Sequence, residues 1–145
     1  LMDAIKLAGK YDDTLLIEKY IIGREITVGI LDYNALPIVE IIPDHQLYDY
    51  ECKYSPGMSQ YLCPADIESN KEKQIKEHSE KIFNLLGCNG YGRLDFLLDK
   101  NGRHFFLELN TLPGMTSTSL LPIAADKSGK SFTDLIGIII RLSLQ

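Results

Sequence analysis

The sequence contains no tryptophan and only three cysteines, Cys52, Cys63 and Cys88. No two of them have the CxxC spacing, so the sequence gives no indication of a structural zinc site. An odd number of cysteines in a chain of 145 residues also argues against a disulfide framework. We therefore expect reduced thiols in a cytoplasmic protein.

Long hydrophobic runs are also missing. The longest, Leu135 to Ile140, is interrupted by Gly137 and falls far short of the roughly 20 residues that a membrane-spanning helix needs. The opening residues, LMDAIKLAGK, lack the basic leader and apolar core of a signal peptide. The formal net charge is −5 and the basic residues are dispersed, which disfavours nucleic acid and anionic membranes as partners.

The sequence does contain a strong hairpin signal. Two alternating segments, 92–100 and 103–110, flank Asn101-Gly102, the dipeptide typical of a two-residue type I′ turn. That turn pairs residues whose numbers add up to 203, so Lys100 faces Arg103. One face of the hairpin is then apolar and suited to burial beneath a helix, with Leu94, Phe96, Leu98, Phe105, Leu107 and Leu109.

The opposite face of this hairpin brings acidic side chains together. The same register places Asp95 opposite Glu108 and Arg93 opposite Asn110. Two opposed carboxylates repel each other, so we expect a cation between them. Such oxygen ligands suit Mg²⁺, which takes one or two carboxylates and completes its shell with water and phosphate oxygens. The alternative is an exposed polar face on which Arg93 neutralises both acids.

The residues that follow Asn110 favour the metal and nucleotide interpretation. Residues 111–119, TLPGMTSTS, form a loop rich in glycine and hydroxyl groups at the same end of the hairpin. Backbone N–H groups in such loops can bind an anion. The sequence thus predicts a Mg²⁺-nucleotide site at this end.

The remaining chain predicts further strands and helices. We expect helices at the start, over 69–86, over 123–126 and from 131 to 144, and strands over 14–22, 24–31 and 36–42. Capping boxes are predicted at Ser69-x-x-Glu72 and Ser131-x-x-Asp134. The last helix is apolar nearly all round, so we expect it to be buried, with any surplus marking contact with a missing domain or a second subunit.

Residues 44–64 show no periodicity and contain four tyrosines. A structureless segment of this length inside a domain is typical of a lid. The alternative is an ordered surface loop whose tyrosines pack down on the domain.

Four long motifs resemble the D-alanine–D-alanine ligase family of the ATP-grasp superfamily: GRLDFLLD, FFLELNTLPGMTSTSLLP, YDYECKY and LLIEKYIIGREITVGIL. They occur in unbroken order over nearly the whole chain. The resemblance implies an α+β fold, the C-terminal portion of an ATP-grasp protein, with an antiparallel sheet and flanking helices. It divides the chain into a partial nucleotide-binding subdomain (1–43), an active-site lid (44–64) and a catalytic domain with the metal site (65–145).

The implied activity is ATP-dependent synthesis of D-alanyl-D-alanine, a peptidoglycan precursor, from two D-alanines through an acyl phosphate. Its implied cofactors are two Mg²⁺ or Mn²⁺ ions, one held by Asp95 and Glu108 and the other by Glu108 and Asn110. Arg93 and the backbone N–H of Gly114 would form an oxyanion hole.

The same resemblance assigns the substrate contacts. The adenine would lie against Glu18, Lys19, Tyr20 and Ile21, and the ribose against Glu25. Lys53 would bind the transferred phosphate, and Tyr54 would join hydrogen bonds near the acceptor amino acid. Ser119 would bind the carboxylate of the second D-alanine, and Leu120 would shape that pocket.

The family also has segments that this chain does not contain. The first residues lack a helix cap and an initiator methionine, so we expect a C-terminal part of a longer protein, with a homodimer as one possible assembly. Alone it is predicted to bind Mg-ATP poorly and to make no dipeptide. Two alternatives stay open: another ATP-grasp carboxylate-amine ligase, and a non-catalytic Mg-nucleotide-binding module.

Overall fold

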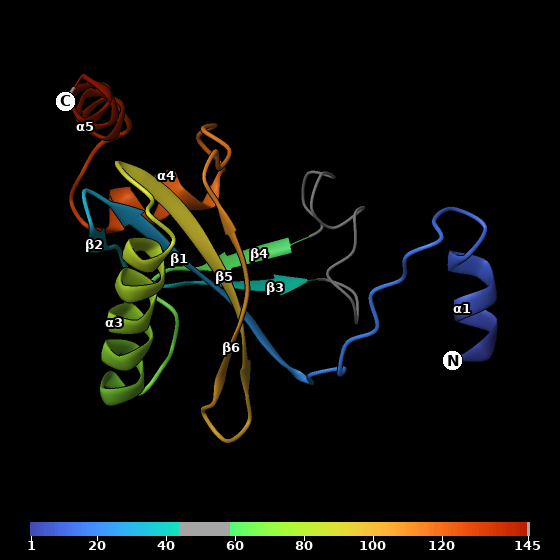
Figure 1. Cartoon of the computed structure of the whole chain (residues 1–145). Helices are drawn as coiled ribbons and strands as arrows, with labels where there is room; N and C mark the ends of the chain where they lie inside the picture. The colour runs from blue at the N-terminus through green and yellow to red at the C-terminus, as the bar shows by residue number, and fades with distance from the viewer. Residues whose placement is uncertain (44–58, 145) are drawn as a thin grey trace.

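The structure is a computed structural model that describes residues 1–43 and 59–144 (Figure 1). Its elements, in chain order, are α1 (Met2–Ala8), β1 (Gly23–Leu31), β2 (Asn34–Ala35), β3 (Val39–Pro43), β4 (Ser59–Leu62), α3 (Ser69–Leu85), β5 (Tyr91–Asp99), β6 (His104–Asn110), α4 (Leu120–Lys127) and α5 (Phe132–Ser143). The strands form one antiparallel sheet in the order β4-β3-β1-β5-β6, with β2 paired to β1. The predicted α+β class, an antiparallel sheet with flanking helices, is confirmed.

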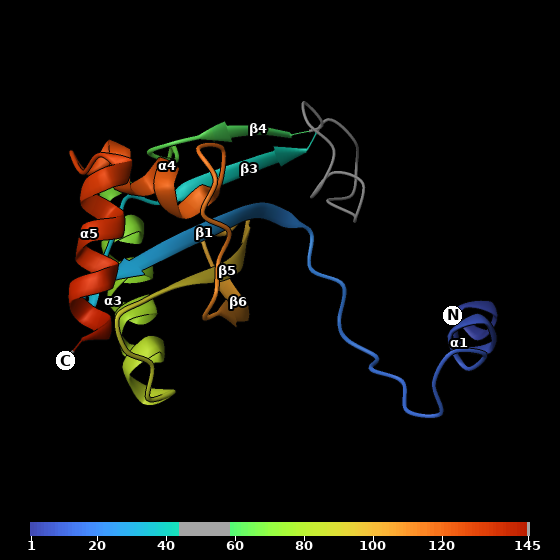
Figure 2. The same cartoon turned by 90° about the horizontal axis from the view of Figure 1, so that it is seen from above.

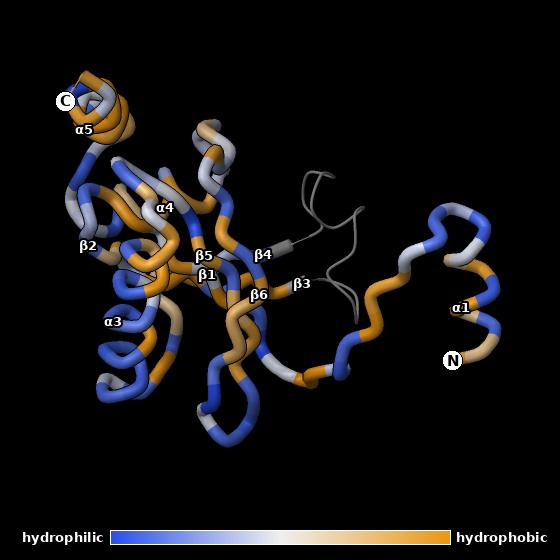
Figure 3. Tube along the Cα trace, in the orientation of Figure 1, coloured by the Kyte–Doolittle hydropathy of each residue, from blue (hydrophilic) through white to orange (hydrophobic). Residues whose placement is uncertain are grey.

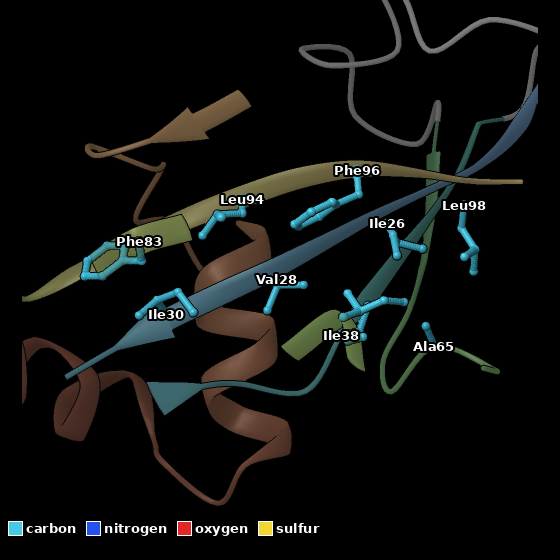
Figure 4. Close-up of a cluster of buried hydrophobic side chains, with 10 residues drawn as sticks. Ile26, Val28, Ile30, Ile38, Ala65, Phe83, Leu94, Phe96 and Leu98 are labelled. Atoms are coloured by element: carbon cyan, nitrogen blue, oxygen red, sulfur yellow. The ribbon is translucent and has the colours of Figure 1, made fainter. Parts of the chain in front are cut away.

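One face of the sheet is closed by α3. Alternate residues of β1 and β5 point to this face because side chains alternate along a strand, and Ile75 and Phe83 of α3 pack against them. Figure 4 shows the resulting cluster, in which β1 contributes Ile26, Val28 and Ile30 and β5 contributes Leu94, Phe96 and Leu98. The predicted burial of the β5 residues beneath a helix is confirmed.

The other face is covered by α4 and, beyond it, α5. Leu120, Leu121 and Ala125 of α4 are buried in a second cluster with apolar residues of β1 and β3. The approach is close: a Cβ atom on Gly29 would lie 2.5 Å from the end of the Leu121 side chain, so any larger residue there would displace Leu121. A helix of eight residues is about 12 Å long, whereas the nine residues of β1 extend about 30 Å. Part of this face therefore stays uncovered.

The turn of the β5–β6 hairpin differs from the predicted two-residue turn. Gly102 has a φ of +73°, but the Gly102 N–H bonds to the carbonyl of Asp99 at 3.0 Å, and the Asp99 N–H pairs with Arg103. The loop is therefore Lys100 to Gly102, and the prediction that Lys100 faces Arg103 is wrong. The reason is Asp99, whose Oδ1 accepts hydrogen bonds from the N–H groups of Asn101 and Arg103, both at 2.9 Å.

A bulge then shifts the hairpin register back. Leu98 pairs with His104 and Phe96 with Phe106, whereas Asp95 pairs with Glu108, which leaves Leu107 as the extra residue. The predicted apolar face is thus wrong at two positions of β6, where His104 and Phe106 take the places expected for Phe105 and Leu107, whereas Leu109 pairs with Leu94 as predicted. The rings of Phe96 and Phe106 are 5.7 Å apart.

The segment before β1 is not the strand that its leucines and isoleucines predict. Residues 15–22 have no regular secondary structure, and α1 before them has no buried residue. Figures 1 and 2 show α1 standing apart from the sheet at the end of this extended segment. A strand needs a neighbour for its backbone hydrogen bonds, and β1 already pairs on both sides, with β3 and β5.

Two helix predictions also need correction. The predicted box at Ser69 does not form: α3 begins with Glu68 as its N-cap and no side-chain cap, and Glu72 instead accepts a hydrogen bond from Lys76. The box between Ser131 and Asp134 is confirmed. In α5 only Leu135 is buried, so the expectation of a buried last helix is wrong, although Figure 3 shows α5 as largely hydrophobic.

Residues 44–58 of the expected lid, with Cys52, Lys53 and Tyr54, lie outside the described part of the chain. Residues Ser59–Leu62, expected to be structureless, form β4 against β3. Within the described ranges, no helix combines the length and the hydrophobicity that crossing a membrane requires.

Candidate functional site

Side chains from four strands meet on the partly uncovered face of the sheet. Glu25 on β1 pairs with Ile41 on β3, which pairs in turn with Tyr61 on β4. Two residues along β1, Thr27 pairs with Asp95 on β5. Directly paired residues project to the same face, so these side chains form adjacent rows across the sheet.

The hairpin extends these rows onto β6. Asp95 pairs with Glu108 and Arg93 with Asn110, as the sequence predicts. The Cβ atoms of directly opposed residues lie about 4.5–5.5 Å apart, so the two carboxylates are neighbours.

These residues line one cavity with a volume of about 650 Å³. It is lined by Glu25, Ile41, Tyr61, Arg93, Asp95, Glu108, Asn110, Leu112, Gly114, Thr116, Thr118, Ser119 and Leu120. The sheet thus forms one wall, and the loop between β6 and α4 forms another.

Asp95 is held by two donors. Arg93 donates from Nε to Oδ1 at 2.9 Å and from a terminal nitrogen to Oδ2 at 2.8 Å. The buried Thr27 hydroxyl lies 2.5 Å from the same Oδ1. The Asp95 side chain is 8% exposed, and a charge at that depth requires such partners. The carboxylate is therefore fixed in orientation at the cavity wall.

The donor set of the cavity fits a hard cation that binds few protein ligands. Across the described residues, no three His, Cys, Asp or Glu side chains come together as a metal site. The cavity instead offers two carboxylates, Asp95 and Glu108, and the amide oxygen of Asn110, which is oriented by a 3.0 Å hydrogen bond from the Leu112 N–H. Mg²⁺ typically takes this number of protein oxygens and leaves the other positions to water and phosphate.

The loop from β6 to α4 is organised around Ser119. The Ser119 hydroxyl accepts a hydrogen bond from the Thr116 N–H at 3.0 Å and lies 2.8 Å from the Thr116 hydroxyl. Gly114 packs against it so closely that a Cβ atom would lie 2.9 Å from Ser119 Oγ. This is the loop that the sequence predicts to face an anion, and it lines the same cavity as the acids.

Residues 1–141 match the protein family described as D-ala D-ala ligase C-terminus. The chain belongs to this family. Over 143 residues it is 47% identical to the D-alanine–D-alanine ligase of Methylacidiphilum infernorum (isolate V4), a match that covers 99% of this chain and 47% of that protein.

Solved structures of D-alanine ligases have the same fold. The D-alanine–D-alanine ligase from Bacillus anthracis complexed with ATP matches with a TM-score of 0.81 at 34% identity, covering 99% of this chain and 47% of that one. The VanG D-Ala:D-Ser ligase from Enterococcus faecalis matches with a TM-score of 0.79 at 32% identity, covering 97% of this chain and 42% of that one. The chain thus spans about half the length of these D-alanine ligases.

The segment that the ligase resemblance assigns to adenine lies elsewhere. Lys19, Tyr20 and Ile21 line a second cavity of about 370 Å³ together with the hairpin turn from Asp99 to Arg103, and Glu18 before them is exposed. The structure thus brings Glu25, but not residues 19–21, into the cavity of the acids.

Asp99 lies in this second cavity. Burial raises its pKa, but hydrogen bonds from the backbone and side chain of Arg103 and from the Asn101 N–H outweigh it, and the net pKa lies below the ordinary value.

The sequence analysis missed five further lining residues: Ile41, Tyr61, Leu112, Thr116 and Thr118. Thr27 does not line the cavity but bonds to Asp95, and it could have been found, because it follows Glu25 by two positions on the same face of an alternating strand. Tyr61 could not, because its segment shows no periodicity. Thr116 lies in a loop without a periodic pattern, where its hydrogen bond to Ser119 has no sequence signal.

Proposed function

We propose that this chain provides the metal-binding and much of the nucleotide-binding part of an ATP-dependent ligase that joins two D-alanines. The observation that carries the proposal is the single cavity in which two acids, an asparagine, an arginine and the Gly114–Ser119 loop meet. Membership in the D-ala D-ala ligase C-terminus family supports it. ATP as co-substrate and a cell-wall precursor as product favour a cytoplasmic enzyme.

The metal ligands would be the three oxygen donors of the cavity. Asp95 and Glu108 would hold one Mg²⁺ or Mn²⁺ ion, and Glu108 and Asn110 a second. The ions would supply positive charge to the phosphate oxygens of ATP. Arg93 holds Asp95 in a fixed orientation, since its guanidinium bonds to both oxygens of that carboxylate.

The nucleotide would lie along the same face of the sheet. Glu25 would accept hydrogen bonds from the ribose hydroxyls, because an ionised carboxylate can accept two such protons. Residues 18–21 would hold the adenine and Lys53 the transferred phosphate.

In the reaction, the carboxylate of the first D-alanine attacks the γ-phosphorus of ATP, which gives an acyl phosphate and ADP. The amine of the second D-alanine attacks the acyl carbon, loses a proton, and expels inorganic phosphate. Arg93 and the Gly114 N–H would stabilise the oxyanion of the tetrahedral intermediate. Ser119 and Leu120 would hold the carboxylate of the second D-alanine, with Tyr54 nearby.

A chimera tests this function. The chain replaces the matching segment of the Methylacidiphilum infernorum ligase, to which it is 47% identical, and the parent enzyme is the matched control. We expect D-alanine-dependent phosphate release and the D-alanyl-D-alanine dipeptide with ATP and Mg²⁺, whereas the chain alone is expected to make none.

The acceptor panel separates the alternatives. D-serine belongs in it because one structural neighbour is a D-Ala:D-Ser ligase, and D-lactate and L-alanine test other ATP-grasp chemistry. A folded chimera that binds ATP but releases no phosphate with any acceptor would support a non-catalytic nucleotide-binding module instead.

The exposed apolar side of α5, including Ile140 at 54% exposure, is where a second subunit or the rest of the ligase would pack. Sedimentation of the chimera tests the homodimer.

A further inference from the structure

We propose that Thr116 is a positioning residue that makes Ser119 a hydrogen-bond donor toward the carboxylate of the acceptor amino acid. The inference rests on the proposed function, in which Ser119 binds that carboxylate. Thr116 contacts Ser119 Oγ twice, through its N–H at 3.0 Å and through its hydroxyl at 2.8 Å.

Counting protons shows why the second contact matters. A serine hydroxyl has one proton and two acceptor lone pairs. The Thr116 N–H occupies one lone pair of Ser119 Oγ. When the Thr116 hydroxyl donates to the other lone pair, the Ser119 proton must point away from both groups and toward the cavity. In the reverse direction, the Ser119 hydroxyl donates its proton to Thr116. An approaching carboxylate then meets only a lone pair of Ser119 Oγ.

Thr118 makes the useful direction available. Its hydroxyl lies 3.3 Å from that of Thr116, so it can donate to Thr116 while Thr116 donates to Ser119. The three hydroxyls then form a chain that runs from Thr118 to Thr116 to Ser119 and ends at the ligand. Both threonines are exposed, so burial does not fix this direction. The anion fixes it, because only one direction gives a carboxylate a donor.

The backbone holds Ser119 in this role. The residue is the N-cap of α4, but its side chain makes no capping hydrogen bond and turns back to Thr116 instead. The Ser119 N–H bonds to the Thr116 carbonyl at 3.0 Å, so the two residues are linked through backbone as well as side chain. A serine N-cap normally stabilises its helix through its side-chain oxygen, but here the Ser119 hydroxyl makes no such bond and contacts Thr116 instead.

The test uses the active chimera and two variants of one residue. Thr116→Val keeps the branched shape and the backbone N–H but removes the hydroxyl, and Thr116→Ser keeps the hydroxyl. We expect Thr116→Val to raise the KM for the acceptor D-alanine by about tenfold, which is the usual effect of losing one hydrogen bond to a charged group. The kcat and the KM for ATP should change less than about twofold, and Thr116→Ser should restore the acceptor KM.

A Ser119→Ala background separates positioning from a direct role. If Thr116 acts through Ser119, then Thr116→Val has no further effect once the serine hydroxyl is gone. A further rise in the acceptor KM in that background would mean that Thr116 binds the substrate itself, and would overturn the inference. So would an unchanged acceptor KM in Thr116→Val alone, with the ligase function left standing. A folded chimera that makes no peptide with any acceptor would remove the proposed function first.

Discussion

Each face of the sheet has an arginine–carboxylate pair, but the surroundings of the two pairs differ. On the face covered by α3, Arg24 bonds to both oxygens of Glu40 at 2.6 Å and also to the Asp66 carbonyl. The pKa of Arg24 is raised, first by the hydrogen bond to Glu40. On the other face, Arg93 bonds to both oxygens of Asp95, but there the pair borders a cavity of about 650 Å³ that also contains Glu108.

The difference follows from the covering helices. The 17 residues of α3 span about 25 Å and close an apolar face, whereas the eight residues of α4 span about 12 Å. The uncovered part of the second face is therefore free to collect polar side chains from several strands. In this sheet, the arginine–carboxylate pair beside the uncovered surface, Arg93 with Asp95, is the one that borders the cavity.

The largest expected effect is on activity at the open face. Glu108→Gln in the chimera should lower kcat/KM for D-alanine by about 10³–10⁴-fold, roughly 4–5.5 kcal/mol, because both ions would lose a charged ligand. Glu108 is exposed, so the melting temperature should stay nearly unchanged. Glu77→Gln makes the same chemical change on the exposed side of α3 and serves as the control in the phosphate-release assay. Near-normal turnover of Glu108→Gln would rule out the metal role.

The closed face should instead respond in stability. Phe83 has no exposed surface and packs edge-on against Tyr33, with ring centres 6.2 Å apart. Phe83→Ala should lower the free energy of unfolding of the chain by about 3–5 kcal/mol, measured by urea denaturation. Phe105→Ala, at a half-buried position on the open face, is the control and should cost less than half as much. Equal losses would mean that the two faces do not differ in packing as described.

Thr27 tests whether the open face also contributes stability. It is 1% exposed, and its hydroxyl bonds to Asp95 and to the Leu94 carbonyl. Thr27→Val keeps the shape but leaves the buried acceptors short of a donor, so the free energy of unfolding should fall by about 1–3 kcal/mol. Thr133→Val, at an exposed position on α5, is the matched control. If both variants unfold at the same urea concentration, the hydrogen bond from Thr27 to Asp95 does not contribute to the free energy of unfolding.

The sequence placed the site pairs correctly although it placed the turn wrongly. The three-residue loop moves the register of the hairpin by one residue, and the bulge at Leu107 moves it back before Asp95. Alternation and turn type therefore predict Asp95 opposite Glu108, but they cannot tell which residue bulges. That depends on how Phe106 and His104 pack beside Phe96, a tertiary contact.

Local composition fails for a related reason at residues 14–22. Their leucines and isoleucines favour a strand, yet a strand also needs a partner with open hydrogen-bonding groups. The sequence of the segment does not state whether one is present. Glu25 and Thr27 were more predictable, because both their alternation and their neighbours lie within one strand.

The smallest expected effect is a dependence on pH at the edge of the α3 face. Burial, then the nearby His78, then Lys71 lower the pKa of His104, whose Nε2 lies 2.7 Å from His78 Nδ1. The folded chain thus binds a proton at His104 less readily than the unfolded chain, whose histidine has a pKa of about 6.5. The contribution of neutral His104 to the free energy of unfolding is fully present above that pH. It is lost as the pH falls toward the lower pKa of the folded chain.

Melting curves of the chain at pH 7.5 and pH 5.5 measure this effect. The melting temperature of the wild type should fall relative to that of His104→Gln as the pH is lowered, because glutamine cannot take up the proton. His78→Gln, which removes the neighbouring charge but leaves His104, should show a smaller fall than the wild type. If the difference in melting temperature between wild type and His104→Gln is the same at pH 7.5 and pH 5.5, protonation of His104 does not destabilise the contact between α3 and β6. Acidification would then affect the two faces of the sheet alike.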